Sequence, residues 1–276
     1  MAQSERAWNG LCYHCGFLIC GLIIVMPELT APVISLLVAV AFCAGFVSSM
    51  AGAGGLITLP ALLWAGLPPL VALGSNKVQS ALGTLVSTVK FVRSGHLELR
   101  VARTGLLMAG GGAVLGTWVV QRLSNAVLEP LLPVVMIAIA LYFLVSPRIG
   151  DDDAPRRVSP RVFDYAGAPV MGFYGGFFGP GMGSIFPFLL VSLRGYNLRK
   201  ATAHTKALVL TVNGTSALLF TAADQVIWKL ALTMAVAQMA GAWFGSGLVI
   251  RRGTRLVQPV IVVITVAVAL RLLWAR

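Results

Sequence analysis

Two lysines lie inside long apolar stretches of the sequence, where a positive charge is unusual. Lys77 follows residues 74–76 (Gly-Ser-Asn), and Lys206 follows residues 203–205 (Ala-His-Thr). A helix rises about 1.5 Å per residue, which would put each lysine Cα about 10 Å below a membrane surface. A lysine at that depth costs a few kcal/mol unless it meets water or a counter-charge. One solution is for the long stem to carry the ammonium group back to the interface.

The acidic residues offer no counter-charge to these lysines. Between Glu28 and Asp224 the acids fall near predicted loops or segment ends, at Glu98, Glu129, Asp151, Asp152, Asp153 and Asp164. A buried ammonium group without a carboxylate partner is suited to bind an anion. We therefore expect the substrate to be a small anion, bound by Lys77 and Lys206, and a cation carrier is disfavoured.

Polar side chains on the same two segments could bind this anion together with the lysines. Asn76 and Asn213 are stronger candidates than the hydroxyl residues, because a hydroxyl can hydrogen-bond its own helix backbone. Thr205 and His204 lie beside Lys206, and His204 is the candidate for proton coupling because histidine titrates near neutrality. The alternatives are a structural hydrogen bond for His204 and interhelical hydrogen bonds for the others.

Two interruptions rich in glycine, at residues 48–55 and 175–183, break the apolar pattern. Broken backbone inside a membrane is tolerated where it is buried in protein or lines a wet cavity. A helix that restarts after such a break directs free N–H groups and its positive dipole end at the cavity, which suits an anion. The alternative is close helix packing through small residues. The candidate anion-binding residues in the breaks are Ser49, Gly52, Gly54, Gly55, Gly179, Pro180 and Gly181.

The composition requires a membrane environment. The chain has 276 residues, of which 58% are hydrophobic and 11% charged, whereas about a quarter of residues are charged in soluble domains. Residues 30–89 contain one charged side chain, Lys77, and residues 207–223 and 230–250 contain none. Such segments are long enough to cross a bilayer. We therefore interpret the net charge of +12 as a signal of membrane orientation, and we expect no nucleic acid partner.

Basic clusters indicate how the chain crosses the lipid bilayer, because cytoplasmic loops retain positive charge. An even number of crossings between successive clusters keeps them all on one side. Residues 163–193 must then leave and return, with a break near residues 179–183. We predict an all-α, polytopic protein with 8–10 membrane segments, including broken or re-entrant helices. The basic clusters lie at residues 90–103, 148–161, 194–200 and 251–255.

The two halves of the chain repeat each other at a constant spacing. Gly45 and Gly52 fall 127 positions before Gly172 and Gly179, and Lys77 falls 129 positions before Lys206. The loop before Lys77 is uncharged and the loop after it is basic, whereas the loops around Lys206 show the opposite order. This reversal predicts two repeats of inverted topology, which many secondary transporters use to build a site near the midplane.

The repeats define four regions. Residues 1–29 form an N-terminal extension or a short extra helix, residues 30–146 the first transmembrane repeat, residues 147–162 a cytoplasmic linker, and residues 163–276 the second transmembrane repeat. The Asp151 to Asp153 run is interpreted as a solvated loop, and Cys12 and Cys15 lack the second ligand pair that a metal site needs. No metal, cofactor or catalytic residue is predicted.

Together these motifs resemble the sulfite exporter (TauE/SafE) family of membrane transporters. The similarity extends from about Pro32 to Leu273 and does not include the leading residues 1–26. It implies a multi-pass permease of the bacterial inner membrane for sulfite, a sulfonate or a related small sulfur-containing anion, usually with seven or eight transmembrane helices. The resemblance rests on residues 45–55, 58–60, 75–77, 172–181 and 200–206.

We therefore expect a secondary transporter that moves a small inorganic or organosulfur anion, with homo-oligomer formation left open. An anion channel is the first alternative. A membrane-embedded enzyme acting on a lipid-linked substrate is disfavoured, because no paired carboxylate, no Cys/His dyad and no metal set lies in the apolar segments.

Overall fold

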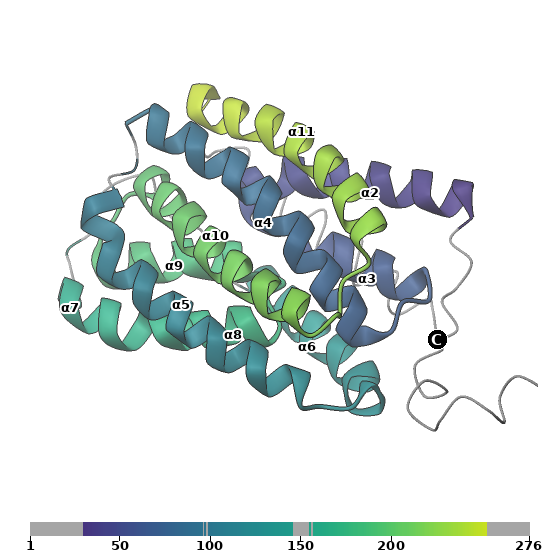
Figure 1. Cartoon of the computed structure of the whole chain (residues 1–276). Coiled ribbons are helices and arrows are strands. Elements are labelled where there is room, and N and C mark those ends of the chain that lie inside the picture. Colours follow the sequence, from purple (N-terminus) through teal and green to yellow (C-terminus); the bar gives the residue numbers. More distant parts are fainter. Residues whose placement is uncertain (1–29, 96, 98, 146–154, 156, 253–276) are drawn as a thin grey trace, which may run out of the picture.

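The computed structural model describes residues 30–95, 97, 99–145, 155 and 157–252, and the secondary structure of this part of the chain is entirely helical (Figure 1). The predicted N-terminal extension, most of the predicted linker and the last 24 residues lie outside the described residues. In chain order the elements are α2 (Ala31–Ala51), α3 (Gly55–Trp64), α4 (Pro69–Arg93), α5 (Leu99–Gln121), α6 (Asn125–Val145), α7 (Pro160–Val162), η1 (Phe163–Gly167), α8 (Ala168–Phe177), α9 (Met182–Arg194), α10 (Leu198–Ala222) and α11 (Trp228–Arg252).

Several of these helices have the length and composition of membrane spans. The segments Ala31–Met50, Ala102–Gln121 and Trp228–Ile250 are each long and apolar enough to cross a bilayer. Large apolar side chains such as Leu107 and Val236 project outward from the bundle, where lipid rather than water is the expected neighbour. The protein is therefore a multi-pass membrane protein. The number of membrane segments stays a prediction.

The sequence located the long helices correctly. The apolar runs 101–123, 127–146 and 201–223 correspond to α5, α6 and α10 within a few residues. Local signals fix some of the helix ends. Asn197 caps α10 by accepting a hydrogen bond from the Lys200 backbone N–H, and basic side chains occupy the last turn of α4, where the negative end of the helix dipole favours positive charge.

Both predicted helix breaks are present. Helix α2 ends at Ala51 and α3 begins at Gly55, with Gly52 between them at φ 72°. Helix α8 ends at Phe177 and α9 begins at Met182, with Gly179 at φ 96° and Gly181 at φ 80°. Glycine adopts this left-handed backbone without the steric cost of a Cβ atom. The glycines therefore permit the sharp turns that separate each pair of half-helices.

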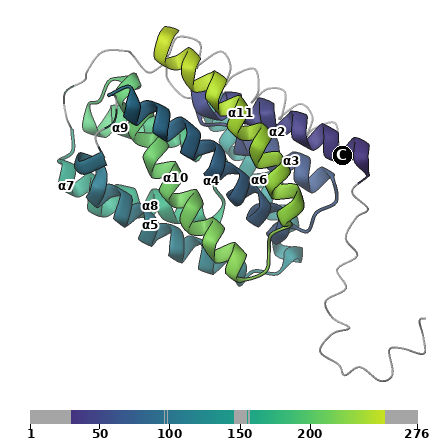
Figure 2. The ribbon, with the colours of Figure 1, turned by 45° about the horizontal axis from the view of Figure 1, so that its top comes forward.

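The long helices α4 and α10 pack against each other in the middle of the bundle, as Figures 1 and 2 show. Helix α11 packs against α2 and α4 on one side, and α5 packs against α8 and α10 on the other. The broken helices α2 and α8 thus each pair with a helix from the other half of the chain. In Figure 1, α4 runs from right to left and α10 from left to right, so the two central helices are antiparallel.

Glycines allow these helix pairs to approach at backbone distance. A Cβ atom at Gly45 of α2 would overlap the Gln238 carbonyl of α11, and one at Gly172 of α8 would overlap the Ala109 carbonyl of α5. Gly112 of α5 is likewise in contact with the backbone of Pro169. Small residues at such positions let membrane helices pack closely. Inside the second glycine-rich segment, Gly176 lies against the Ala113 backbone of α5 in the same way, so close packing, the alternative considered for these segments, is correct for Gly176.

Two adjacent glycines of α5 test this packing. Gly112 contacts the Pro169 backbone, whereas nothing lies within 4 Å of a Cβ atom at Gly111. We expect Gly112→Ala to destabilise the purified protein by about 1–3 kcal/mol through overpacking. Gly111→Ala should be neutral or stabilising by up to about 1 kcal/mol, because alanine favours a helix. Thermal unfolding in detergent measures the stability of both variants, and equal unfolding midpoints for Gly112→Ala and Gly111→Ala would contradict the packing.

Candidate functional site

Both sequence-predicted lysines are buried in the middle of the bundle. Lys77 on α4 is 1% exposed and Lys206 on α10 is 3% exposed. Neither ammonium group therefore reaches the surface, and the snorkelling alternative is wrong for both side chains. A buried charge of this kind needs partners inside the protein or from a ligand.

Each ammonium group donates a hydrogen bond to a backbone carbonyl of a broken helix. Lys77 Nζ donates to the Gly175 carbonyl of α8, and Lys206 Nζ donates to the Ser48 carbonyl of α2. Both carbonyls lie in the last turn before a break, where the helix dipole is negative. The Ser48 carbonyl also accepts the Gly52 backbone N–H at 2.9 Å. Each lysine thus connects a long helix of one half to a broken helix of the other.

These carbonyl contacts do not neutralise the two charges. Glu129, Asp164 and Asp224 are the acids in the described part of the chain. Asp164 forms an ion pair with Arg194, at 3.1 Å between carboxylate and guanidinium. No ion pair joins Lys77 or Lys206 to a carboxylate among the described residues. A neutral carbonyl solvates an ammonium group but does not cancel its charge.

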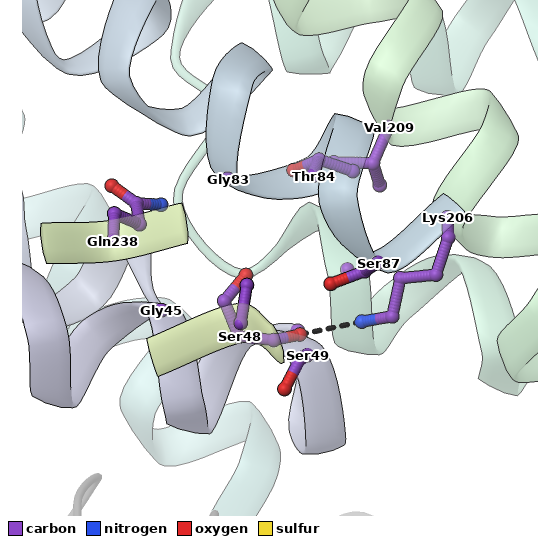
Figure 3. A pocket seen from close by; sticks show the side chains of 12 residues that line it. Gly45, Ser48, Ser49, Gly83, Thr84, Ser87, Lys206, Val209 and Gln238 are labelled. Atoms are coloured by element: carbon purple, nitrogen blue, oxygen red, sulfur yellow. Dashed lines mark hydrogen bonds between the residues drawn. The ribbon is translucent and has the colours of Figure 1, made fainter. Parts of the chain in front are cut away.

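Lys206 faces a pocket between α2, α4, α10 and α11 (Figure 3). Its walls offer one positive charge together with neutral hydroxyl and amide groups, and no acidic side chain is among them. Such a set of donors is suited to an anion. The residues lining the pocket are Gly45, Ser48, Ser49, Gly52, Gly83, Thr84, Ser87, Gly183, Lys206, Val209, Gln238 and Ala242.

The two helix breaks meet beside this pocket. Gly52 touches the backbone of Gly183 so closely that a Cβ atom on either residue would overlap the other, and Gly55 packs against Pro180. The Tyr174 hydroxyl donates to the Pro180 carbonyl at 2.5 Å across the second break. The breaks therefore form one central junction, and Gly52 and Gly183 belong to both the junction and the pocket wall.

The surroundings of Lys77 are more tightly filled. A Cβ atom at Gly179 would meet the Lys77 ammonium group, and one at Gly175 would meet the side chains of Met182 and Val212. The Lys77 side chain and its carbonyl partner are thus enclosed by neighbouring atoms. The two lysines make matching hydrogen bonds in unlike surroundings.

Other predicted site residues lie outside the pocket. The Asn76 side-chain oxygen accepts hydrogen bonds from Thr58 Oγ1 at 2.6 Å and from Gln79 Nε2 at 3.0 Å. His204 lies 3.0 Å from the Lys200 carbonyl through Nδ1, and its ring centre is 5.1 Å from that of Tyr196. These contacts are those of structural side chains, and proton coupling through His204 stays a prediction.

The remaining predicted residues divide between the junction and α10. Thr205 and Asn213 are buried on α10, and the Thr205 hydroxyl has no hydrogen-bond partner among the described residues. Gly54 packs against Ser48 and the Ala44 carbonyl, and Gly181 caps the start of α9. Of the candidates from the sequence, Ser49, Gly52 and Lys206 line the pocket.

The restarting helices do not present the free N–H groups expected from the sequence. Glycine turns close short hydrogen bonds at the start of each half-helix, so the expectation is wrong for most of the N–H groups in the first turns. The donors are Leu56 to Ala53, Ile57 and Thr58 to Gly54, Met182 to Gly179, and Ser184 and Ile185 to Gly181. Positive charge at the junction therefore comes from lysine side chains rather than from these helix starts.

Sequence reasoning missed several residues of the pocket. Gly83 and Gln238 belong to no motif that predicted a site, and Ser48 lies in the 48–55 interruption without having been named as a candidate. Gln238 is a single amide in the uncharged run 230–250, and its isolation in an apolar segment is the one signal that could have singled it out.

Known proteins resemble this chain over most of its length. The family described as Sulfite exporter TauE/SafE matches residues 37–272. A "Probable membrane transporter protein ORF9" of Sinorhizobium sp is 42% identical over 90% of this chain and 95% of its own length. The Escherichia coli K12 "Probable membrane transporter protein YfcA" is 40% identical over 85% of this chain and 87% of its own. No solved structure matches the chain.

Gly179 allows a test of the Lys77 environment with a matched control. Gly179 and Gly95 both have left-handed backbones, at φ 96° and 74°, but a Cβ atom would meet Lys77 only at Gly179, with nothing within 4 Å at Gly95. Alanine should cost about 1–2 kcal/mol of backbone strain at either position. The Gly179→Ala variant should lose about 1–3 kcal/mol more, through overpacking.

Chemical or thermal unfolding in detergent measures this difference, and a double-mutant cycle with Lys77→Ala assigns it to the lysine. Equal destabilisation by Gly179→Ala and Gly95→Ala, with no coupling to Lys77, would show that the ammonium group does not lie against the break.

Proposed function

The chain belongs to the TauE/SafE family of membrane transporters, and from this premise we propose that it is a secondary transporter that moves a small sulfur-containing oxyanion across the bacterial inner membrane. The observation that carries the proposal is the pair of buried ammonium groups, on Lys77 and Lys206, without a carboxylate partner among the described residues. Ionisable groups inside a membrane protein mark substrate or ion pathways.

The chemistry around Lys206 supports an anion as the transported species. Its pocket combines an ammonium group with the hydroxyls of Thr84 and Ser87 and contains no acidic side chain. A carboxylate would be needed to hold a cation beside a lysine. The description of the family as sulfite exporters supports a sulfur oxyanion, and sulfite and sulfonates are the substrates that we propose.

We further propose that residues 30–146 and 163–276 are inverted repeats. The spacings of 127 and 129 positions that relate the sequence motifs also relate the lysine contacts. Ser48 and Gly175 are 127 positions apart, and Lys77 and Lys206 are 129 apart. The hydrogen bond from Lys206 to Ser48 in one half therefore corresponds to the hydrogen bond from Lys77 to Gly175 in the other. By the same spacings, the close approach of Gly45 to Gln238 corresponds to the close approach of Gly172 to Ala109. The opposite directions of α4 and α10 in Figure 1 support the inversion.

Inverted halves suggest alternating access as the mechanism. Lys206 on α10 is tied to the Ser48 carbonyl of α2, so an arriving anion competes with that carbonyl for the ammonium group. Charge-assisted hydrogen bonds to an anion are stronger than those to a neutral oxygen. Binding would therefore loosen a contact between α10 and α2 and favour a conformation in which these helices separate, which is how a ligand shifts a conformational equilibrium.

Purified protein in liposomes tests the role of the lysines. Loss of a hydrogen bond to a charged group costs about 1.5–3 kcal/mol, so Lys206→Met and Lys77→Met should each reduce sulfite flux about tenfold or more. The exposed Lys229 at the start of α11 is the control, and Lys229→Met should transport at the parent rate.

Counterflow and saturation should accompany the parent flux if the protein is a carrier, whereas single-channel currents would identify an anion channel. If both buried-lysine variants, folded and inserted, transport sulfite as fast as the parent protein, the lysines do not bind the substrate.

A further inference from the structure

We infer that the pocket at Lys206 is a binding site for one monovalent oxyanion and that Gln238 of α11, with Thr84 of α4, selects this ligand. The inference rests on the proposed anion transport and specifies its substrate class. It assigns a binding role to Gln238, which no sequence motif indicated, and to Thr84, one of the hydroxyl residues of the Lys77 segment.

The charge of the pocket fixes the charge of its ligand. Lys206 is the one basic side chain among the residues that line the pocket, and no acidic side chain lines it. A monoanion beside this ammonium group forms a neutral pair. A dianion would leave one negative charge without compensation in a site of low dielectric, where an isolated charge is strongly disfavoured. Lys77 cannot supply it, because its ammonium group is bound to Gly175 of α8 and does not line the pocket.

Neutral donors surround this single charge. The hydroxyls of Thr84 and Ser87, one turn apart on α4, make no hydrogen bond to another described residue, whereas the Ser49 hydroxyl is already bonded to the Phe46 carbonyl. Figure 3 shows the Thr84 and Ser87 hydroxyls directed toward the side of the pocket where Ser48 and Gln238 lie. In this conformation the cavity of about 10 Å³ has room for about one water. Two unused hydroxyls and one ammonium group can therefore bind several oxygens of one oxyanion when Lys206 is released from the Ser48 carbonyl and the pocket opens.

Gln238 completes the set from the opposite wall. Its side chain is 2% exposed, and its amide oxygen is buried without a hydrogen-bond partner among the described residues. In Figure 3 its amide nitrogen faces the pocket. The unpartnered oxygen lies on the far side of the amide from the pocket, so the amide N–H groups are the part of Gln238 that can donate to a ligand there. An N–H donor beside the ammonium group suits the oxygens of an oxyanion.

Glycine makes the space for this amide. A Cβ atom at Gly83 of α4 would collide with the Gln238 side chain, so the absence of a side chain at Gly83 allows the glutamine to lie between α11 and α4. The pocket is therefore shaped by a residue pair from two helices that are far apart in the sequence.

The other half of the protein does not repeat this site. At the corresponding spacings, Gly175 replaces Ser48, Val212 replaces Gly83 and Ala109 replaces Gln238. The side chains of Met182 and Val212 occupy the space beside Gly175. The chain thus has a polar pocket at Lys206 and a filled counterpart at Lys77, and Lys77 acts as a connection between α4 and α8.

Binding measurements on the full chain in lipid nanodiscs test the inference. Methanesulfonate and sulfamate are monoanions close in size and shape to sulfate, which is a dianion. Because of the uncompensated charge, both monoanions should bind about tenfold or more tightly than sulfate at the same pH and ionic strength. The use of two monoanions, one with a methyl group and one with an amino group, separates charge from apolar contact.

Variants then assign the selectivity to residues. Gln238→Leu and Thr84→Val each remove a polar group at nearly constant volume and should weaken monoanion binding about fivefold or more. Gln121→Leu is the matched control, because the Gln121 amide donates to the Leu219 carbonyl away from the pocket, and should bind like the parent. Thermal unfolding checks that each variant is folded. If Gln238→Leu does not fold, the affinity of Thr84→Val for the monoanions tests the inference.

The outcomes separate the two proposals. If binding is saturable and depends on Lys206 but sulfate and methanesulfonate bind with equal affinity, the pocket does not select monoanions. If folded Gln238→Leu and Thr84→Val bind the monoanions with the affinity of the parent protein, these two residues do not select the ligand. If none of the three anions binds saturably, or if Lys206→Met leaves their binding unchanged, the proposal that this site transports an anion is itself wrong.

Discussion

Two buried ammonium groups constrain the centre of this protein. Each is held by a backbone carbonyl at the end of a helix that breaks at glycine, and no carboxylate pairs with either among the described residues. Ionisable groups inside membrane segments often mark substrate or ion pathways; we propose this role for Lys206, whereas Lys77 links α4 to α8. The accepting carbonyls lie just before the glycine turns, and α4 and α10, which carry the two lysines, pack against each other.

Close helix approach makes this arrangement possible. Because Gly45 lacks a side chain, α2 lies directly against the Gln238 backbone of α11, and the Gln238 side chain reaches the pocket beside Lys206. Gly52 and Gly183 bring the two breaks into contact at the same place. The pocket is thus a product of packing between distant segments, and its single charge and neutral donors follow from which side chains those segments carry.

The sequence predicted the elements better than the site. Long apolar runs and dense glycine are local signals, so the helices, both breaks and the buried lysines could be identified without coordinates. Gln238 and Gly83 could not, because their roles depend on α11 lying against α4. The free N–H groups expected after the breaks are absent at most of the first-turn positions, because the carbonyls of Ala53, Gly54, Gly179 and Gly181 accept them in local turns. Helix dipole reasoning alone could not anticipate those turns.

The most direct test of the central claim is a crystal structure of the lipid-embedded protein with bromomethanesulfonate, in which the anomalous signal of bromine locates the anion. We expect the sulfonate oxygens within hydrogen-bond distance of Lys206 Nζ and Thr84 Oγ1, with the Lys206 bond to the Ser48 carbonyl released. A fully occupied anion elsewhere, with Lys206 still bound to Ser48 or paired with a carboxylate of the chain, would contradict it.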